Sequence, residues 1–316
     1  MKLLITGDWH ICHNTPINRI DNLFKTQNRK LSFILDTAIE EGCKYILQPG
    51  DFYNTWKIPH HLERYVINKL KKYSDVKILT IFGQHDLRYH SSDKKNTPLS
   101  VLEAAKVVTI IQNDTPICLN TMRTKEEKAV YLYGVSWKEK IPTQLLNGIN
   151  ILSLHDLVTE EGKGWEKKKT KVHSLFDQTD FDLMVTGDNH KSFAYSDGER
   201  HLINCGSLMR SHIDQEEHQP YVYVYDTEIN KVQGFPVPVE PFVVVMNVEK
   251  AKKEKKENET LGAFVKGLKN DIVLTGLDFK NNLWKYMKAN KIRKGISNIL
   301  NEVMGGKEVK REKNDM

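Results

Sequence analysis

The sequence predicts an α/β protein, and three observations support this class. Over about the first 90 residues, strand-like apolar runs alternate with amphipathic helical segments, as they do in layered α/β proteins. From about residue 107, strand-like runs follow one another with little helical pattern between them, which indicates a second, mainly antiparallel sheet. With 316 residues and 39% hydrophobic content, the chain can bury one large core or two modest ones.

The first part of the chain reads as three strands separated by two helices. The strands are expected at residues 2–6 (KLLIT), 44–50 (KYILQPG) and 76–83 (VKILTIFG). The first helix is expected over residues 28–41, with an inner face of Leu31, Ile34, Leu35, Ala38 and Ile39 and with Gly42 as its C-terminal cap. The second is expected over residues 59–73, with Pro59 in its first turn and an inner face of Leu62, Tyr65, Val66 and Leu70.

The strand-like runs after residue 107 are short and rich in β-branched and aromatic residues. They are VVTII, YLYGVSW, NILSLH, FDLMVTG, RHLINCG and YVYVYD, the last with a regular alternation of tyrosine and valine. The core is expected to end near residues 231–241. We therefore divide the chain into a globular domain at 1–242 and a C-terminal segment at 243–316.

The C-terminal segment reads as a charged linker, a helix and a tail that is expected to be disordered. Residues 281–304 carry a loose apolar stripe of Leu283, Met287, Ile296, Ile299, Leu300 and Val303. Two interpretations of this helix stay open. It caps the core, or it docks onto a partner protein.

Composition narrows the class of protein without defining its partner. The net charge of +6, from 47 Lys+Arg against 41 Asp+Glu, permits a polyanionic partner, but solvated lysines explain it equally well. The four cysteines are scattered, which is typical of a reducing compartment. No apolar run approaches the ~20 residues of a membrane helix, and the first residues do not form a secretory signal. We expect a cytoplasmic protein that does not associate with membranes.

Acidic and imidazole side chains recur where the predicted strands end. The stretches ITGDWH (5–10) and VTGDNH (185–190) share a Gly-Asp turn followed by a histidine, and further polar residues follow other strands. Any one Gly-Asp turn is ordinary loop chemistry. Five such strand ends are better explained by a shared site, because strand ends of one sheet, or of two packed sheets, converge on one edge. The set is Asp8, His10, Asp51, Gln84, His85, Asp86, His155, Asp188 and His190.

These residue types indicate the chemistry of the predicted site. Carboxylates and imidazoles without cysteine suit manganese, iron or zinc. About seven donors exceed the needs of one ion, so two ions that share a bridging carboxylate fit better. Such pairs stabilise the attacking and leaving oxygens of an in-line displacement at phosphorus. Neither a serine or cysteine nucleophile with a paired base nor a phosphate-binding glycine loop occurs, so a metal-activated water is the expected nucleophile.

This order of motifs resembles the calcineurin-like metallophosphoesterases. Within that family the chain is most similar to the SbcD-type nuclease subunit of bacterial and phage double-strand-break repair complexes. The similar stretches are GDFYNTWKIPHHLERYVINKLKKY (50–73), ILSLHDLV (151–158) and INCGSLMR (203–210), within a match over about residues 1–240. The resemblance implies a four-layer αββα sandwich, in which helices flank two mixed β-sheets.

The resemblance also implies a role for each site residue. The first metal would be held by Asp8, His10, Asp51 and His190. The second would be held by the bridging Asp51 together with Gln84, His155 and Asp188. His85 would act beside the leaving group as a catalytic residue, and Asp86 would fix its tautomer.

Two of these positions depart from the pattern of the family. Gln84 stands where the family usually has asparagine, and Asp188 replaces the first histidine of the family's GHxH motif. The carboxylate of Asp188 adds negative charge and a hard oxygen ligand, which favours manganese or magnesium over zinc at the second site. Both residues can still bind a metal, so we interpret them as changes in metal preference.

The leading functional expectation is a manganese-dependent DNA exo- and endonuclease that works with an SbcC-type coiled-coil ATPase and forms a homodimer. The alternatives are a small-molecule phosphodiesterase or nucleotide phosphatase of the same fold, and a catalytically silent scaffold. The stretch GKGWEKKKTK (162–171) is either a solvated loop or a contact to nucleic acid through its lysines and Trp165.

Overall fold

The computed structural model describes residues 1–249 except 17, 92, 121–126, 161–169 and 213–214, and also describes residues 283, 285–287, 289 and 290. Two compact units divide the chain, Met1–Val248 and Glu249–Met316. In the second unit Leu283 and Met287 are helical and buried, whereas Ile296, Ile299, Leu300 and Val303 of the predicted stripe lie outside the described residues, as does Trp165.

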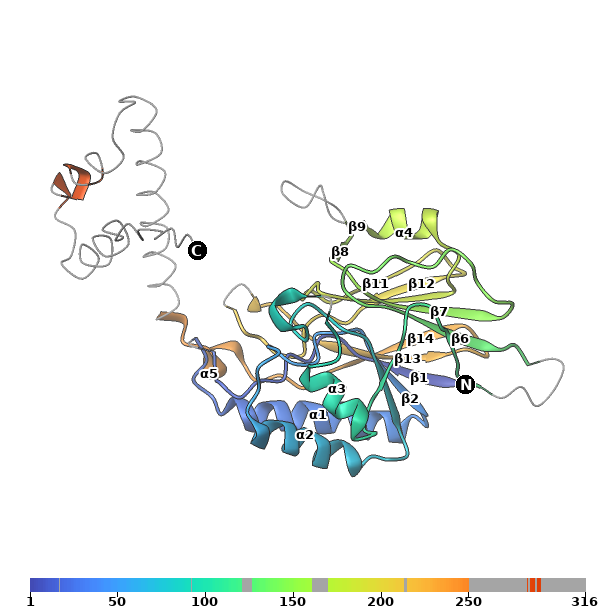
Figure 1. The fold of residues 1–316 in the computed structure, drawn as a ribbon, viewed down its shortest axis with the longest axis horizontal. Coiled ribbons are helices and arrows are strands. Elements are labelled where there is room, and N and C mark those ends of the chain that lie inside the picture. The colour runs from blue at the N-terminus through green and yellow to red at the C-terminus, as the bar shows by residue number, and fades with distance from the viewer. Residues whose placement is uncertain are drawn as a thin grey trace, which may run out of the picture. The chain divides into compact units, whose positions relative to one another are not determined.

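The first unit is built of two mixed sheets packed between helices, the four-layer arrangement expected from the family resemblance (Figure 1). The helices α1 (Leu23–Glu40), α2 (His60–Lys71) and α3 (Pro98–Ala104) cover the outer face of one sheet, and α4 (Val172–Gln178) covers the other. A short helix, α5 (Phe242–Val245), ends the unit. None of the helices in the described part of the chain is both long and apolar enough to cross a membrane.

The first sheet has a parallel centre with two antiparallel strands added at one edge. Strands β1 to β4 run parallel, β13 pairs antiparallel with β1, and β14 pairs antiparallel with β13. The strands lie in the order β14 (Lys231–Pro236), β13 (Tyr221–Asp226), β1 (Lys2–Ile5), β2 (Tyr45–Gln48), β3 (Lys77–Thr80) and β4 (Thr109–Ile110).

The second sheet has four parallel strands at its centre and an antiparallel strand at each edge. The order is β11 (Phe193–Ser196), β12 (His201–Asn204), β10 (Leu183–Gly187), β7 (Ile149–His155), β6 (Val130–Val135) and β5 (Ile117–Cys118). A separate small sheet pairs β8 (Val158–Thr159) with β9 (Thr170–Lys171).

The prediction of a mainly antiparallel second sheet is therefore wrong in three respects. Its centre is parallel, the VVTII run contributes β4 to the first sheet, and the YVYVYD run joins the first sheet as β13. The connection from β6 to β7 contains no helix, and α4 is the only helix among the described residues between β7 and β10, which exclude 161–169. Parallel strands are usually connected by a long helix, which is recognisable in a sequence. Because no such helical pattern separates these strands, the sequence did not indicate that they run parallel.

The predicted helices are present with small changes at their ends and faces. Helix α1 begins before residue 28 because the Asn22 side chain accepts a hydrogen bond from the Lys25 N–H and caps the first turn. Ile39, assigned to the inner face, is 51% exposed near the end of the helix. Tyr65 of α2 is half-buried, and its hydroxyl donates to Asn28 of α1, which joins the two helices.

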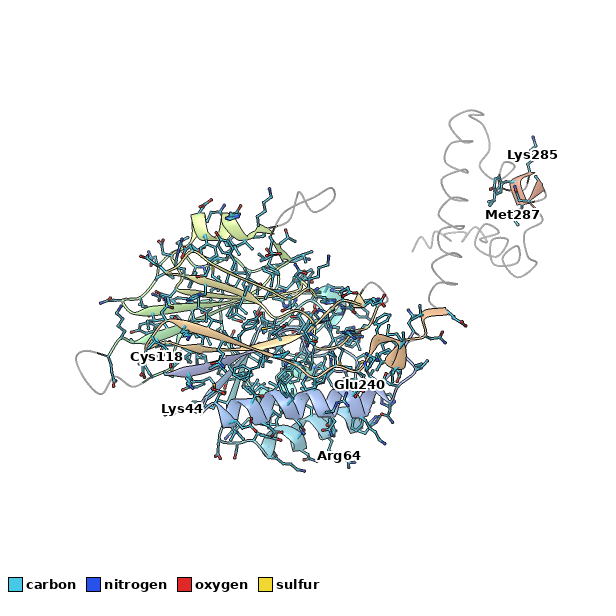
Figure 2. The ribbon with its side chains drawn as sticks, turned by 180° about the vertical axis from the view of Figure 1, so that it is seen from behind. Lys44, Arg64, Cys118, Glu240, Lys285 and Met287 are labelled. Carbon is cyan, nitrogen blue, oxygen red and sulfur yellow. The ribbon has the colours of Figure 1, made fainter. Side chains whose placement is uncertain are left out.

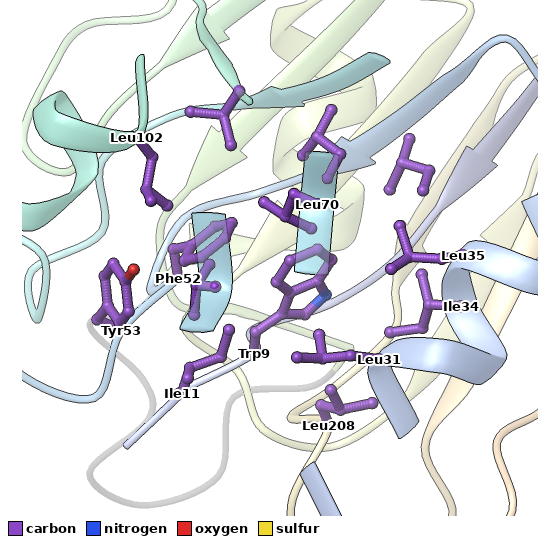
Figure 3. Close-up of a cluster of buried hydrophobic side chains, with 14 of the residues drawn as sticks. Trp9, Ile11, Leu31, Ile34, Leu35, Phe52, Tyr53, Leu70, Leu102 and Leu208 are labelled. Carbon is purple, nitrogen blue, oxygen red and sulfur yellow. The ribbon is translucent and has the colours of Figure 1, made fainter. Parts of the chain in front are cut away.

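Alternating residues of the strands separate three apolar layers. Leu3 and Ile5 of β1 face the second sheet, whereas Leu4 faces the helices. Trp9, which follows β1, lies 4.7 Å from Phe52 between ring centroids and is fully buried among Leu31 and its neighbours on α1 (Figure 3). Side chains fill the space between the two sheets as well (Figure 2). The loops after β1 and β2 thus start from closely packed, buried strands.

Candidate metal centre

Five strand ends bring the predicted site residues together in the structure. Asp8 and His10 follow β1, Asp51 follows β2, His155 ends β7, and Gln84 with His85 follows β3. Asp188 and His190 follow β10, which completes the set. Backbone bonds link the loops, for example from the His10 N–H to the Asp51 carbonyl at 3.0 Å. The two sheets place their carboxyl ends side by side, and the donors meet there.

The potential metal donors fall into sets whose ligand atoms lie within 4.8 Å of one another. One set is Asp8, His10 and His190, and a second is Asp51, His155 and Asp188. Asp51 Oδ2 lies 3.7 Å from His10 Nε2 and 3.5 Å from His155 Nε2, so this carboxylate stands between the two sets. A third set, of His10, Asp51 and His85, places the His85 ring beside the same carboxylate.

Gln84 connects the second set through both atoms of its amide. Its Oε1 lies 2.7 Å from His155 Nε2, and its Nε2 donates to Asp188 Oδ1. The amide oxygen therefore reaches the same small volume as the other donors despite the extra methylene relative to asparagine.

Two buried carboxylate oxygens test whether these residues fit divalent ions. Asp8 Oδ1 and Asp51 Oδ2 accept no hydrogen bond from the described residues, although both side chains are almost completely buried. Leaving a charged oxygen unpaired in the interior is costly, and a cation removes that cost. His10 and His190 also face each other, with 3.0 Å between their Nε2 atoms. This donor set suits divalent metal ions with mixed oxygen and nitrogen ligands.

The protonation equilibria of these groups reflect the same crowding. Burial lowers the pKa of His10 to about 3, which leaves a neutral imidazole with a free lone pair. Burial raises the pKa of Asp8. Burial also lowers the pKa of His155, but the negative charge of the nearby Asp51 outweighs this effect and raises that pKa to about 10.

The site is buried on its floor and open at its mouth. The side chains of Asp51 and His155 have no exposed surface, whereas those of His85 and His190 are 39% and 37% exposed. A substrate would therefore meet His85 and His190 first.

The predicted role of Asp86 is wrong. Its Oδ2 accepts from the Phe52 and Gly83 N–H groups, and its Oδ1 accepts from the Tyr53 N–H at 3.0 Å. The His85 ring is held instead by the Asn54 carbonyl, 3.0 Å from Nδ1. Burial, followed by the charge of Asp51, raises the pKa of Asp86 to about 7. Asp86 shapes the loop after β2, so its contribution to the site is structural.

The glycines before the aspartates make room for the neighbouring donors. A Cβ on Gly187 would lie 2.7 Å from both Asp8 Oδ1 and His155 Nδ1. A Cβ on Gly50 would lie 2.5 Å from His155 Nδ1, and Gly50 has a φ of +94°. Close packing in the site therefore explains why glycine precedes aspartate at these recurring positions.

Two buried side-chain amides stabilise the loops that carry the metal donors. The sequence motifs did not identify them. The Gln48 side chain accepts from the Gly50 N–H and donates to the Gly50 carbonyl, which fixes the turn before Asp51. The Asn204 amide donates to the carbonyls of Asn189 and Lys191, on either side of His190. Both residues end buried strands, and that position is the signal by which they could have been found.

Comparison with known proteins gives one family. The family described as calcineurin-like phosphoesterase matches residues 1–192, more than half of the chain. No curated protein matches. Among solved structures, TT1561 of Thermus thermophilus is similar with a TM-score of 0.45 and 11% identity, over 75% of this chain and 99% of that one. The hypothetical protein PH1004 from Pyrococcus horikoshii OT3 has a TM-score of 0.37 and 13% identity, over 80% and 94% of the two chains.

The family match spans all seven of the predicted metal ligands, from Asp8 to His190. Together with the αββα architecture and the clustered donors, it establishes that the chain belongs to the calcineurin-like phosphoesterases.

Proposed function

We propose that this phosphoesterase is a DNA nuclease that uses two divalent ions, with manganese as the first candidate. The observation that carries the proposal is the buried Asp51 Oδ2, which has no hydrogen-bond partner among the described residues and has three imidazole nitrogens 3.5–3.9 Å away. A carboxylate oxygen in that position fits the bridge between two ions. Asp8, His10 and His190 would hold one ion, and Gln84, His155 and Asp188 the other.

When bound, such ions polarise the phosphoryl oxygens and lower the pKa of water, which makes a nucleophile available at neutral pH. The chain's own residues supply orientation and proton delivery. The Pro49 carbonyl, 2.6 Å from His155 Nδ1, turns Nε2 of that ring toward the ligand volume. The Asn54 carbonyl does the same for His85, whose partly exposed ring would protonate the departing oxygen through Nε2.

The choice of DNA as substrate is supported by sequence features outside the ligand set. The stretches at 50–73, 151–158 and 203–210 resemble the SbcD-type nucleases more than other branches of the family. The open mouth at His85 and His190 also accommodates a polymer more readily than a closed pocket would. A smaller phosphodiester or nucleotide substrate is the alternative that the experiment must separate.

Digestion of end-labelled duplex DNA tests this proposal. We expect cleavage with manganese, none with chelator, and none by Asp51→Asn, because loss of the bridging carboxylate removes a shared ligand. Cleavage of nucleotide esters or bis(4-nitrophenyl) phosphate without cleavage of long DNA would show the small-molecule alternative to be right. Absence of any manganese-dependent hydrolysis would contradict both.

The proposed partner is a coiled-coil ATPase of the SbcC type, and the C-terminal segment is the proposed contact. Its support is the resemblance to the nuclease subunit and the apolar stripe predicted over residues 281–304. Deletion of residues 260–316 is expected to abolish co-purification with that ATPase while the nuclease unit keeps its manganese. Unchanged association after deletion would refute the assignment.

A further inference from the structure

Beside the metal centre, three loops build a cluster of aromatic and cationic side chains that we call the aromatic ridge. Trp56 comes from the loop before α2, and Arg88, Tyr89 and His90 form a tight turn after β3, inside which Tyr89 has a non-helical backbone with a φ of 51°. Trp137 and Lys138 follow β6. There the Trp137 N–H donates to the Phe82 carbonyl and links the ends of the two sheets. The ridge consists of Trp56, Arg88, Tyr89, His90, Trp137 and Lys138.

The rings of the ridge continue directly from the ligand rings. The His10 and His85 centroids are 5.1 Å apart, and the next step, from His85 to His90, is 6.3 Å. His90 lies 5.6 Å from Trp137. The rings of His10, His85, His90 and Trp137 therefore form a continuous row that starts in the metal centre.

The exposed part of the ridge is not explained by core packing. Tyr89 is 74% exposed, yet its ring lies 5.0 Å from that of the half-buried Trp56. Large aromatic rings in a solvated pair are typical of surfaces that bind a ligand. Trp137 differs, because one part of it packs against the core.

Cations accompany the rings. The Arg88 guanidinium lies 5.4 Å from the Trp56 centroid and 5.5 Å from the Tyr89 centroid, and Lys138 Nζ lies 3.8 Å from that of Trp137. Neither cation forms an ion pair with a carboxylate among the described residues, whereas the nearby Glu139 is paired with Lys94. The surface thus offers positive charge together with exposed ring faces.

Backbone conformation sets the ridge apart as well. Eight non-glycine residues in the described part of the chain have positive φ values. Three of them are the metal-centre residues His10, Asp51 and Asp188, and three more are Tyr89, His90 and Lys138 of the ridge. Such conformations cost free energy and concentrate at functional sites, where surrounding structure maintains them.

We infer that the aromatic ridge binds unpaired nucleotides of single-stranded or frayed DNA beside the scissile phosphate. Bases stack on Trp56 and Tyr89, while Arg88 and Lys138 contact the flanking phosphates. Flat rings with unpaired cations match the two recurring elements of single-strand recognition, which is tolerant of sequence. The inference rests on the proposed nuclease function and specifies its substrate as a strand that is locally unpaired.

Fluorescence anisotropy with fluorescein-labelled (dT)12 in the presence of chelator tests binding without cleavage. We expect Trp56→Ala/Tyr89→Ala to bind about 5- to 150-fold more weakly than the unmodified protein, the range for stacking of one base. Trp56→Phe/Tyr89→Phe should recover most of the affinity. Phe24→Ala, which removes a 44% exposed ring from its pair with Tyr65, is the control and should bind normally.

A dodecamer of abasic nucleotides separates stacking from charge. We expect the unmodified protein and Trp56→Ala/Tyr89→Ala to bind it equally, because it has phosphates but no bases. Arg88→Gln should bind both oligomers more weakly than the unmodified protein does, and its binding should depend less on salt concentration. Circular dichroism establishes that each variant is folded.

The outcomes distinguish this inference from the proposed function. Equal affinities of Trp56→Ala/Tyr89→Ala and the unmodified protein for (dT)12 would refute base stacking on the ridge. The same conclusion would follow if the variant lost as much affinity for the abasic oligomer as for (dT)12. The unmodified protein's manganese-dependent hydrolysis of bis(4-nitrophenyl) phosphate and of DNA is measured separately. Failure there with ring-dependent binding intact would refute nuclease activity and leave the ridge as a nucleic-acid site.

Discussion

His85 stands at the mouth of the metal centre, held by a backbone carbonyl and aimed at Asp51. Its Nε2 lies 3.9 Å from Asp51 Oδ2, while the Asn54 carbonyl fixes Nδ1. The ring is 39% exposed, whereas the side chains of Asp51 and His155 have no exposed surface. Because His85 also belongs to a donor set with His10 and Asp51, its proposed role in proton delivery has to be tested apart from metal binding.

We predict that His85→Ala keeps both metals and loses turnover by roughly 10²–10⁴-fold, because general acid catalysis typically contributes that much. Manganese content and the rate of bis(4-nitrophenyl) phosphate hydrolysis are the measurements. His60→Ala removes a fully exposed histidine and serves as the matched control. A His85→Ala protein with full metal content and near-normal turnover would exclude the role.

We propose that Asp188 sets the metal preference of the second proposed ion position. Its carboxylate is hydrogen-bonded to Gln84 and lies in the donor set with Asp51 and His155. We predict that Asp188→His shifts selectivity from manganese toward zinc, because a neutral nitrogen replaces a charged oxygen. Competition titrations with the two metals, on this variant and on Asp188→Asn, measure the shift. Unchanged selectivity in Asp188→His would show that the other ligands set the preference.

At the scale of elements, the carboxyl ends of β1, β2, β3, β7 and β10 form the site because two sheets meet at one edge. The close approach of β10 to the loop after β1 requires a residue without a side chain at Gly187, which faces Asp8 and His155. The site therefore depends on how tightly the sheets pack, as well as on the identity of its donors.

We predict that Gly187→Ala lowers manganese affinity at least tenfold and destabilises the protein by about 1–3 kcal/mol, the usual cost of overpacking. Metal titration and urea unfolding measure the two effects. Gly198→Ala is the control, because a Cβ there meets no atom within 4 Å, although its φ of +101° carries a local cost. Retention of normal metal affinity in Gly187→Ala would contradict the packing argument.

At the scale of the whole molecule, a buried amine joins helix α1 to the loop after β12. Lys30 Nζ donates to the Leu208 carbonyl, and Arg19 and Arg210 lie near it. Burial, reinforced by these two cations, lowers the pKa of Lys30 to about 7. The unfolded chain keeps the ordinary pKa near 10.5, so it binds more protons than the native protein between these two values.

Stability linked to Lys30 must therefore rise with pH from about 7 toward 10. We predict that the difference in unfolding free energy between the unmodified protein and Lys30→Met changes by roughly 1–2 kcal/mol from pH 7 to pH 8.5, in favour of the unmodified protein. Urea unfolding of both proteins across this range measures the difference, and shared titrations cancel. Parallel pH profiles would show that the Lys30 amine titrates normally.

Strand-end residues were predictable because each follows an apolar run directly in the sequence. Asp8, Asp51 and Asp188 all carry the same local signal, a buried strand followed by Gly-Asp. By contrast, the Asn54 carbonyl that orients His85 is 31 residues away in the chain, and Gln84 meets Asp188 across 104 residues. A local sequence pattern does not indicate such long-range contacts. The orientation of the His85 ring was therefore attributed to its sequence neighbour Asp86 and not to the Asn54 carbonyl.

The sequence by itself determined the α/β class, the strand ends that carry donors and the family to which the chain belongs. Only the tertiary structure decided that YVYVYD joins the first sheet, that the second sheet has a parallel centre and that the aromatic ridge continues from the metal centre. The physical reason is the range of the interactions. Burial periodicity and turn chemistry act within a few residues, whereas strand pairing and ring contacts join segments that are distant along the chain.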